Sequence, residues 1–308
     1  ITDYKLETKI DGKNGTVTVI NMSDVDIRCV IGETEVVAKV GESATLTVEG
    51  IRPWTPEDPK LYGLYLYANG EKIEEKIGFR EVSIDGKVFK INGVAVKLKG
   101  VNHHDTHETK GYVMSFEDLI KDIELMKQHN INAVRTSHYP QPTEWYDLCD
   151  EHGLLLIDEA NIEAHGCGTS WHESYPEFHP SHREEWKGTH HDRVRSMVER
   201  DKNHPCVIMW SVGNEMGVGR NQAKAYDYLH ARSPECIVHC EDFSRRWAHA
   251  RLPDYEKYAN YPHIGIDSIE KNTDRLTGVK GRANLEKMLT LSAKVIDGEE
   301  LFGATLLV

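Results

Sequence analysis

The chain has 308 residues, of which 39% are hydrophobic and 28% are charged, and its formal net charge is −13. This composition is typical of a globular protein, the length suits two domains, and the negative charge argues against nucleic acid or an anionic membrane as partner. No apolar stretch approaches membrane-spanning length.

The chain begins at Ile1, and its opening residues are not a signal peptide, so we expect a piece of a longer product. Scattered cysteines in a chain of this size favour reduced thiols in a cytoplasmic protein over a disulfide framework. The six cysteines are Cys29, Cys149, Cys167, Cys206, Cys236 and Cys240.

Residues 1–84 are rich in segments that alternate apolar and polar side chains and are separated by turn residues. The segments expected to be strands are 16–22, 26–32, 35–40, 44–50, 61–70 and 71–79. Short strands at this spacing predict a β-sandwich of the immunoglobulin type. Titratable residues do not cluster there, so we expect a scaffold.

From Gly78 the pattern changes to a hairpin, a strand over Val94–Gly100, and then alternating helices and strands. Expected helices are 115–130, 142–153, 183–204 and 221–233, and expected strands are 131–140, 154–166, 207–210 and 236–242. This alternation predicts a (β/α)8 TIM-type barrel over residues 85–308.

The barrel pattern weakens after Asp242. Three further strands over 263–268, 294–300 and 301–308, with helices over 245–259 and 285–292, would complete eight strands in a short barrel. A truncated, incomplete barrel fits the same residues equally well.

The stretch VIMWSVGNEMG, residues 207–217, carries the clearest chemical signal. Its apolar strand ends at Gly213, and Asn214 and Glu215 follow at the end where a parallel barrel has its active residues. Partial desolvation there would help Glu215 to hold a proton as a general acid. The alternative is that Glu215 only caps the following helix.

Three other strand ends also carry polar residues, and a barrel would gather all four around one hollow. They are NHHDTHE (102–108), RTSH (135–138) and DEANIEAHG (158–166). This combination suits sugar chemistry: His and Asn bond ring hydroxyls, and a tryptophan such as Trp171 could stack on a sugar face. Glu163 and His165 with another carboxylate could hold a divalent ion, and oxygen ligands would favour magnesium over zinc.

Several longer stretches resemble glycoside hydrolase family two, specifically its β-galactosidases rather than the related glucuronidases. They are PWTPEDPKLY, GFREV, GVNHHDTH, LMKQHNINAVRTSHYP, LCDEHGLLLIDEANIEAHG and RDKNHPCVIMWSVGNEMG. The resemblance covers about Thr16 to Glu241. It implies an immunoglobulin-like domain, a catalytic barrel, and retaining hydrolysis of terminal non-reducing β-D-galactosides, such as a disaccharide, by two glutamates.

The resemblance also implies individual roles. Glu215 resembles the general acid/base, and Asn214 resembles the residue that contacts the sugar 2-hydroxyl. Glu163 and His165 resemble Mg2+ ligands, with Glu215 completing the set. The remaining matches are His104 and His138, which resemble transition-state-stabilising histidines, and Arg135, which resembles the arginine that orients the nucleophile.

The sequence departs from the family in two places. The N-terminal jelly roll is absent, and the nucleophile motif is not recognisable, so the nucleophile is unknown, with Glu299 and Glu241 as positional candidates. Retention requires a second carboxylate about 5 to 5.5 Å from the acid/base. The alternative is therefore a non-catalytic fragment or divergent relative that keeps a sugar or metal pocket. Association into a homo-oligomer is left open.

Overall fold

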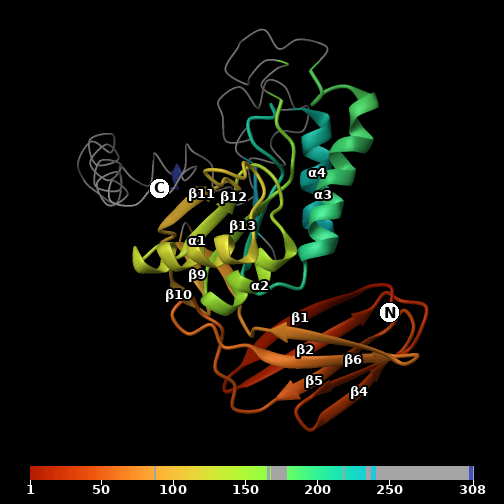
Figure 1. Ribbon diagram of the computed structural model, residues 1–308. Coiled ribbons are helices and arrows are strands. Elements are labelled where there is room, and N and C mark those ends of the chain that lie inside the picture. The colour runs from red at the N-terminus through yellow and green to blue at the C-terminus, as the bar shows by residue number, and fades with distance from the viewer. Residues whose placement is uncertain are drawn as a thin grey trace. The chain divides into compact units, whose positions relative to one another are not determined.

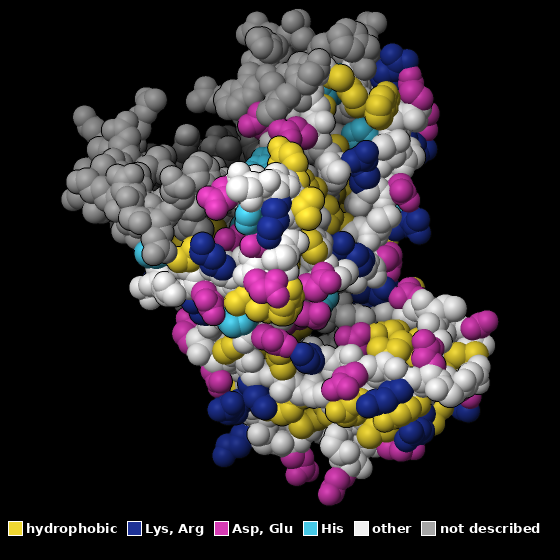
Figure 2. All heavy atoms as spheres, in the orientation of Figure 1, with side chains coloured by type: hydrophobic (Ala, Val, Ile, Leu, Met, Phe, Trp, Pro, Cys, Tyr) yellow, Lys and Arg dark blue, Asp and Glu magenta, His cyan; other side chains and the backbone are white. Residues whose placement is uncertain are grey.

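The computed structural model describes residues 1–86, 88–164, 167, 179–217, 219–233 and 237–240, and the backbone of 305–307. None of the described helices is both long and apolar enough to cross a membrane. On the face drawn in Figure 2, acidic and basic side chains are interspersed, so this face presents no broad field of one sign.

The N-terminal part forms two antiparallel sheets, as the alternating pattern predicts (Figure 1). The first has the order β1-β2-β5 and the second β4-β3-β6-β7. Their strands are β1 (Tyr4–Asp11), β2 (Asn14–Asn21), β3 (Ile27–Ile31), β4 (Thr34–Ala38), β5 (Ser43–Val48), β6 (Tyr62–Ala68) and β7 (Glu71–Ile77).

Buried side chains from both sheets form one hydrophobic cluster, in which Val17, Ile27 and Leu64 are fully buried. They alternate with exposed residues because successive side chains of a strand point to opposite faces. Strand β1 was missed by the sequence analysis. Its burial does not alternate, since the adjacent Lys5 and Leu6 are both buried.

A small antiparallel sheet of order β10-β9-β8 follows, which confirms the expected hairpin. The prediction of one strand over Val94–Gly100 is wrong. Val94 and Ala95 pair with β9, and the parallel sheet begins only at Gly100, where an added Cβ would lie 3.1 Å from Ala133. The strands are β8 (Val82–Asp85), β9 (Val88–Ile91) and β10 (Val94–Ala95).

The second part is an α/β arrangement around a six-stranded sheet of order β15-β14-β13-β12-β11-β16. Pairs β11–β12 and β14–β15 are parallel, and a helix lies between consecutive strands from β11 to β15, as the sequence predicts. The strands are β11 (Gly100–His103), β12 (Ala133–Thr136), β13 (Leu155–Glu159), β14 (Val207–Ser211), β15 (Ile237–His239) and β16 (Thr305–Leu307).

The capping residues in the sequence mark where helices begin and end. Ser115 caps α1 with a capping box, its side chain accepting from the Asp118 N–H, and Gly153 follows α2 with a φ of +72°. Helices α3 and α4 lie side by side, and Glu199 of α3 accepts from Tyr228 and Arg232 of α4 (Figure 1). The helices are α1 (Phe116–Gln128), α2 (Thr143–His152), α3 (Lys187–Asp201), preceded by a 3-10 turn (Glu184–Trp186), and α4 (Arg220–Arg232).

The C-terminal expectation is corrected in one respect. Strand β16, within the predicted segment 301–308, pairs with β11 in the antiparallel direction and so does not continue the parallel order. The expected strands 263–268 and 294–300 lie outside the described residues.

Mutual contacts divide the chain into two compact units. The first contains Ile1–Lys97, Thr143–Leu155 and Arg200–Val207, and the second contains Leu98–Pro142, Leu156–Glu199 and Ile208–Val308. The domain boundary expected between residues 84 and 85 stays a prediction.

Asp150 joins several segments of the first unit and is 3% exposed. Its carboxylate accepts from the Cys206 N–H at 2.8 Å and bonds His204 Nδ1 at 2.7 Å, and its carbonyl accepts from Trp54 Nε1. Burial alone would lower the pKa of His204, but the hydrogen bond and charge of Asp150 outweigh it and raise that pKa.

We expect Asp150→Asn to lower the free energy of unfolding by about 3 kcal/mol, because it breaks a buried ionic hydrogen bond. Because the pKa of His204 is raised in the folded state, its pairing with Asp150 contributes its full stabilisation below the unfolded-state pKa of about 6.5. This stabilisation is lost as the pH rises through the folded-state pKa. Urea unfolding should therefore show a larger loss at pH 6 than at pH 9. The exposed Asp24→Asn in the same unit is the control, with an expected change within about 0.5 kcal/mol; equal losses in both variants would contradict the prediction.

Candidate active site

The candidate site is built at the ends of four neighbouring strands of the second unit, β11 to β14. Asn102 lies in β11, Arg135 in β12 and Glu159 at the end of β13, while Asn214 follows the end of β14. Every residue of β12, β13 and β14 is buried, so the polar groups at their ends must satisfy one another.

Glu159 is the centre of this arrangement and is 0% exposed. Its Oε2 accepts from Arg135 Nε at 2.6 Å and from Ser211 Oγ at 2.6 Å. Its Oε1 lies 2.7 Å from His138 Nδ1, and its backbone N–H donates to Thr136 Oγ1 at 2.8 Å. One carboxylate thus links the ends of β12, β13 and β14.

The charge of Glu159 is held by these partners. Full burial would raise the pKa of the carboxyl group, but the Arg135 charge and the hydrogen bonds from His138 and Ser211 outweigh it and hold the pKa below its usual range. Glu159 is therefore ionised near neutral pH.

A second chain of contacts leads from Arg135 toward Glu163. Arg135 Nη2 donates to Asn214 Oδ1 at 3.0 Å, and Asn214 Nδ2 donates to Glu163 Oε1 at 3.0 Å. The Asn214 N–H also donates to the Ile162 carbonyl at 2.9 Å. Arg135 and Asn214 are 7% and 6% exposed, whereas Glu163 is exposed. The structure therefore brings three of the predicted site residues together.

Glu215 follows this chain on a tightly turned backbone. Gly213 has a φ of +135°, and a Cβ added to it would lie 2.5 Å from the Ile162 carbonyl oxygen. Glu215 itself has a φ of +38° and is half-buried. Only glycine adopts the Gly213 conformation readily, so this glycine allows Asn214 and Glu215 to project from the strand end.

The two predicted histidines contact each other. The rings of His104 and His138 have centroids 5.2 Å apart in an edge-to-face arrangement, and both residues are half-buried. Burial and the neighbouring His138 and His103 hold the pKa of His104 below its ordinary value. His104 is accordingly neutral near neutral pH and suits a hydrogen bond to a neutral ligand.

The predicted metal set is only partly described. His165 lies outside the described residues, while Glu163 touches Asn214, the neighbour of Glu215. Two carboxylate-bearing loops thus meet, and such oxygen donors suit Mg2+.

Within the described ranges, the one group of three potential ligands within reach of each other is Asp147, Asp150 and His204. Both carboxylate oxygens of Asp150 already bond protein groups, so we interpret this cluster as structural.

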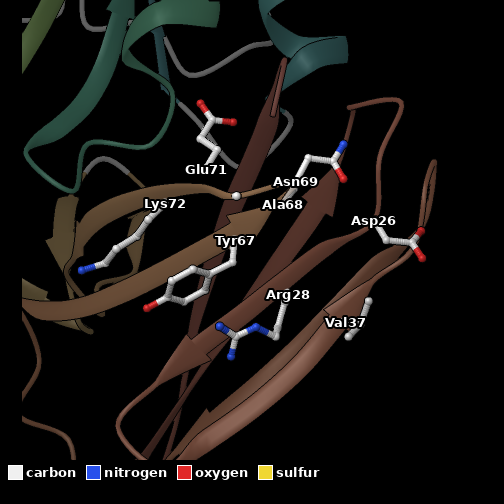
Figure 3. A pocket seen from close by; sticks show the side chains of 9 residues that line it. Asp26, Arg28, Val37, Tyr67, Ala68, Asn69, Glu71 and Lys72 are labelled. Carbon is white, nitrogen blue, oxygen red and sulfur yellow. The ribbon is translucent and has the colours of Figure 1, made fainter.

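The outer face of the β4-β3-β6-β7 sheet has a shallow hollow of about 540 Å³ (Figure 3). Its charged side chains are engaged: Arg28 lies 4.1 Å from the Tyr67 ring centre and bonds Glu35, and Asp26 bonds Lys39. This hollow therefore lacks the convergent unpaired groups of a reactive site.

Glu159 lies in the polar strand end 158–166 that the sequence predicts, but no role follows for it from the sequence. The sequence signal for such a role is the pair of adjacent acids, Asp158 and Glu159, at the end of a strand that is buried on both faces. A buried carboxylate requires a cation nearby. The nucleophile candidates Glu241 and Glu299, and the expected stacking residue Trp171, lie outside the described residues.

Residues 82–280 match the TIM barrel domain of glycosyl hydrolases family 2. A β-galactosidase of Streptococcus thermophilus is 39% identical over 265 residues, which cover 78% of this chain and 25% of the relative. A β-galactosidase of Priestia megaterium is 47% identical over 195 residues, or 61% of this chain and 19% of the relative. The chain spans about a quarter or less of the length of these relatives.

Among solved structures, a β-D-glucuronidase of Dictyoglomus thermophilum is similar with a TM-score of 0.66 and 25% identity, covering 78% of this chain and 43% of that one. The β-glucuronidase of Ruminococcus gnavus in complex with uronic isofagomine has a TM-score of 0.65 and 26% identity, covering 77% of this chain and 43% of that one.

Proposed function

Because this chain belongs to glycosyl hydrolases family 2, we propose that its strand-end site serves the hydrolysis of terminal β-D-galactosides with retention. The contact chain from Arg135 through Asn214 to Glu163 is the observation that carries the proposal, since it fixes the residue next to Glu215. Relatives named β-galactosidase at 39% and 47% identity support a galactoside, such as a disaccharide, as substrate.

In this proposal Glu215 protonates the leaving glycosidic oxygen and then activates the water that releases the sugar. Asn214 bonds the sugar 2-hydroxyl, and Arg135 orients the nucleophile, a carboxylate for which Glu241 and Glu299 are the candidates. His104 and His138 bond the sugar as positive charge develops on its ring.

We also propose that Glu163, His165 and Glu215 hold Mg2+. The contact between the Glu163 and Asn214 side chains supports it, because it brings the carboxylate loop of Glu163 to the loop of Glu215. A bound ion would supply fixed positive charge beside the acid/base.

The fold proposal is an immunoglobulin-like β-sandwich over residues 1–84 and a short or incomplete (β/α)8 TIM-type barrel over 85–308, because β16 pairs with β11 in the antiparallel direction. The two antiparallel sheets, the parallel pairs β11–β12 and β14–β15, and the match to a TIM barrel domain support it. The five cysteines in the described part of the chain form no disulfide, which agrees with the proposed cytoplasmic location.

A second candidate is a non-catalytic chain that retains a sugar or metal pocket. The nucleophile motif that is not recognisable in the sequence favours keeping this candidate.

The test is an assay of the 308-residue chain with nitrophenyl β-D-galactoside and, in parallel, the matching β-D-glucuronide. We expect the galactoside to be turned over at least about tenfold faster than the glucuronide. A pocket that bonds the hydroxymethyl group of a galactoside would leave the carboxylate of a glucuronide unpaired. Faster turnover of the glucuronide would overturn the substrate assignment. Galactose binding by calorimetry without turnover of either substrate would establish the second candidate instead.

A further inference from the structure

Glu159 makes more contacts with the candidate site than any role assigned so far explains. It is fully buried, so it cannot touch a sugar. It nevertheless bonds His138, which the proposed function places against the sugar, and Arg135, which the proposed function assigns to orienting the nucleophile. Through Arg135 it also reaches the Asn214 amide, 3.0 Å from Arg135 Nη2.

The ionised carboxylate decides which nitrogen of His138 carries hydrogen. A carboxylate only accepts hydrogen bonds, so at 2.7 Å from Glu159 Oε1 the Nδ1 of His138 must be the donor. The other ring nitrogen, Nε2, can then bond a ligand, because the His138 side chain is only half-buried. The His104 ring contacts the His138 ring edge to face, with ring centroids 5.2 Å apart.

The same carboxylate also restrains Arg135. The guanidinium is bonded by Glu159 through Nε at 2.6 Å, by Asn214 at 3.0 Å and by Asn102 at 3.3 Å, so its plane is fixed on three sides. Removing the negative charge would leave a buried cation with amide partners alone, and it would then be free to shift.

We propose that Glu159 is a positioning residue that sets the tautomer of His138 and the orientation of Arg135 before a sugar binds. Like carboxylates behind metal-bound histidines, it acts through the group that it holds. The inference rests on the proposed function for the roles of His138, Arg135 and Asn214, but the geometry that it predicts exists without substrate.

The first test needs no activity. ¹⁵N-histidine NMR of the wild-type 308-residue chain at about pH 8, with the His138 signals identified by their loss in His138→Gln, reports which ring nitrogens carry hydrogen. We expect Nδ1 to be protonated in wild type and to lose its fixed protonation in Glu159→Gln, whose amide can donate as well as accept. A wild-type His138 with a bare Nδ1 would overturn the proposal even if Glu159→Gln misfolds.

The second test is kinetic. We expect Glu159→Gln to lower kcat for an aryl β-galactoside about 100-fold with a much smaller change in KM, because misplaced groups cost most in the transition state. Glu159→Asp, which keeps the charge, should recover part of the loss.

The matched control is Asp122→Asn, which removes a carboxylate 2.9 Å from His103 Nε2 in the same unit but outside the Glu159 contacts. We expect its kcat to stay within about threefold of wild type. A folded Glu159→Gln with unchanged kcat and unchanged His138 signals would show a purely structural role. An inactive wild type would refute the proposed function alone, since the NMR result still decides the positioning role.

Discussion

Glu215→Gln is expected to slow the hydrolysis of an alkyl β-galactoside by about 1000-fold, because a glutamine cannot protonate the departing oxygen. An aryl galactoside whose leaving group is an acidic phenol can release the phenolate without receiving a proton. The rate of its glycosidic bond cleavage should therefore fall much less in the variant. The measurement is kcat/KM for a series of galactosides with graded leaving groups. A steeper dependence on leaving-group basicity in the variant identifies Glu215 as the acid.

The control for this variant is Glu124→Gln, which makes the same chemical change at an exposed position of α1 in the same unit. It should leave the whole series unchanged, since surface substitutions of this kind alter little. If Glu215→Gln leaves the rates of both poor and good leaving groups intact, the acid/base assignment is wrong.

Gly213→Ala is expected to lower the free energy of unfolding by about 3 kcal/mol and to reduce galactoside hydrolysis by at least about 100-fold. The new Cβ would lie 2.5 Å from the Ile162 carbonyl oxygen and from Met216 Sδ, on a φ of +135° that side chains rarely adopt. The Ile162 carbonyl also accepts the Asn214 N–H, so relieving the clash moves the residue next to Glu215. Urea unfolding and steady-state kinetics measure the two effects separately.

Gly188→Ala provides the comparison, because Gly188 lies in α3 and an added Cβ meets nothing within 4 Å. Alanine favours a helix by up to about 1 kcal/mol over glycine, so this variant should be as stable as wild type or more stable, with full activity. A Gly213→Ala variant that behaves like Gly188→Ala would show that the turn before Glu215 tolerates a side chain.

The strand ends of the candidate site could be predicted from the sequence, because each is a local pattern of an apolar run followed by polar residues. Arg135, Asn214 and Glu215 stand out in this way, and the structure brings the first two into contact. The importance of Glu159 could not be predicted. Its partners Arg135 and Ser211 are 24 and 52 residues away in the chain, and no local pattern states which distant donors a buried carboxylate will meet.

The sequence by itself determined the alternation of strands and helices, the cap of α1 and the polar strand ends, since periodicity and capping act within a few residues. Only the tertiary structure decided that β1 pairs with β2, that the parallel strand starts at Gly100, and that β16 runs antiparallel to β11. It also decided that one buried carboxylate organises the strand ends. Strand pairing and the burial of charge depend on which distant segments meet, and that is a property of the folded chain.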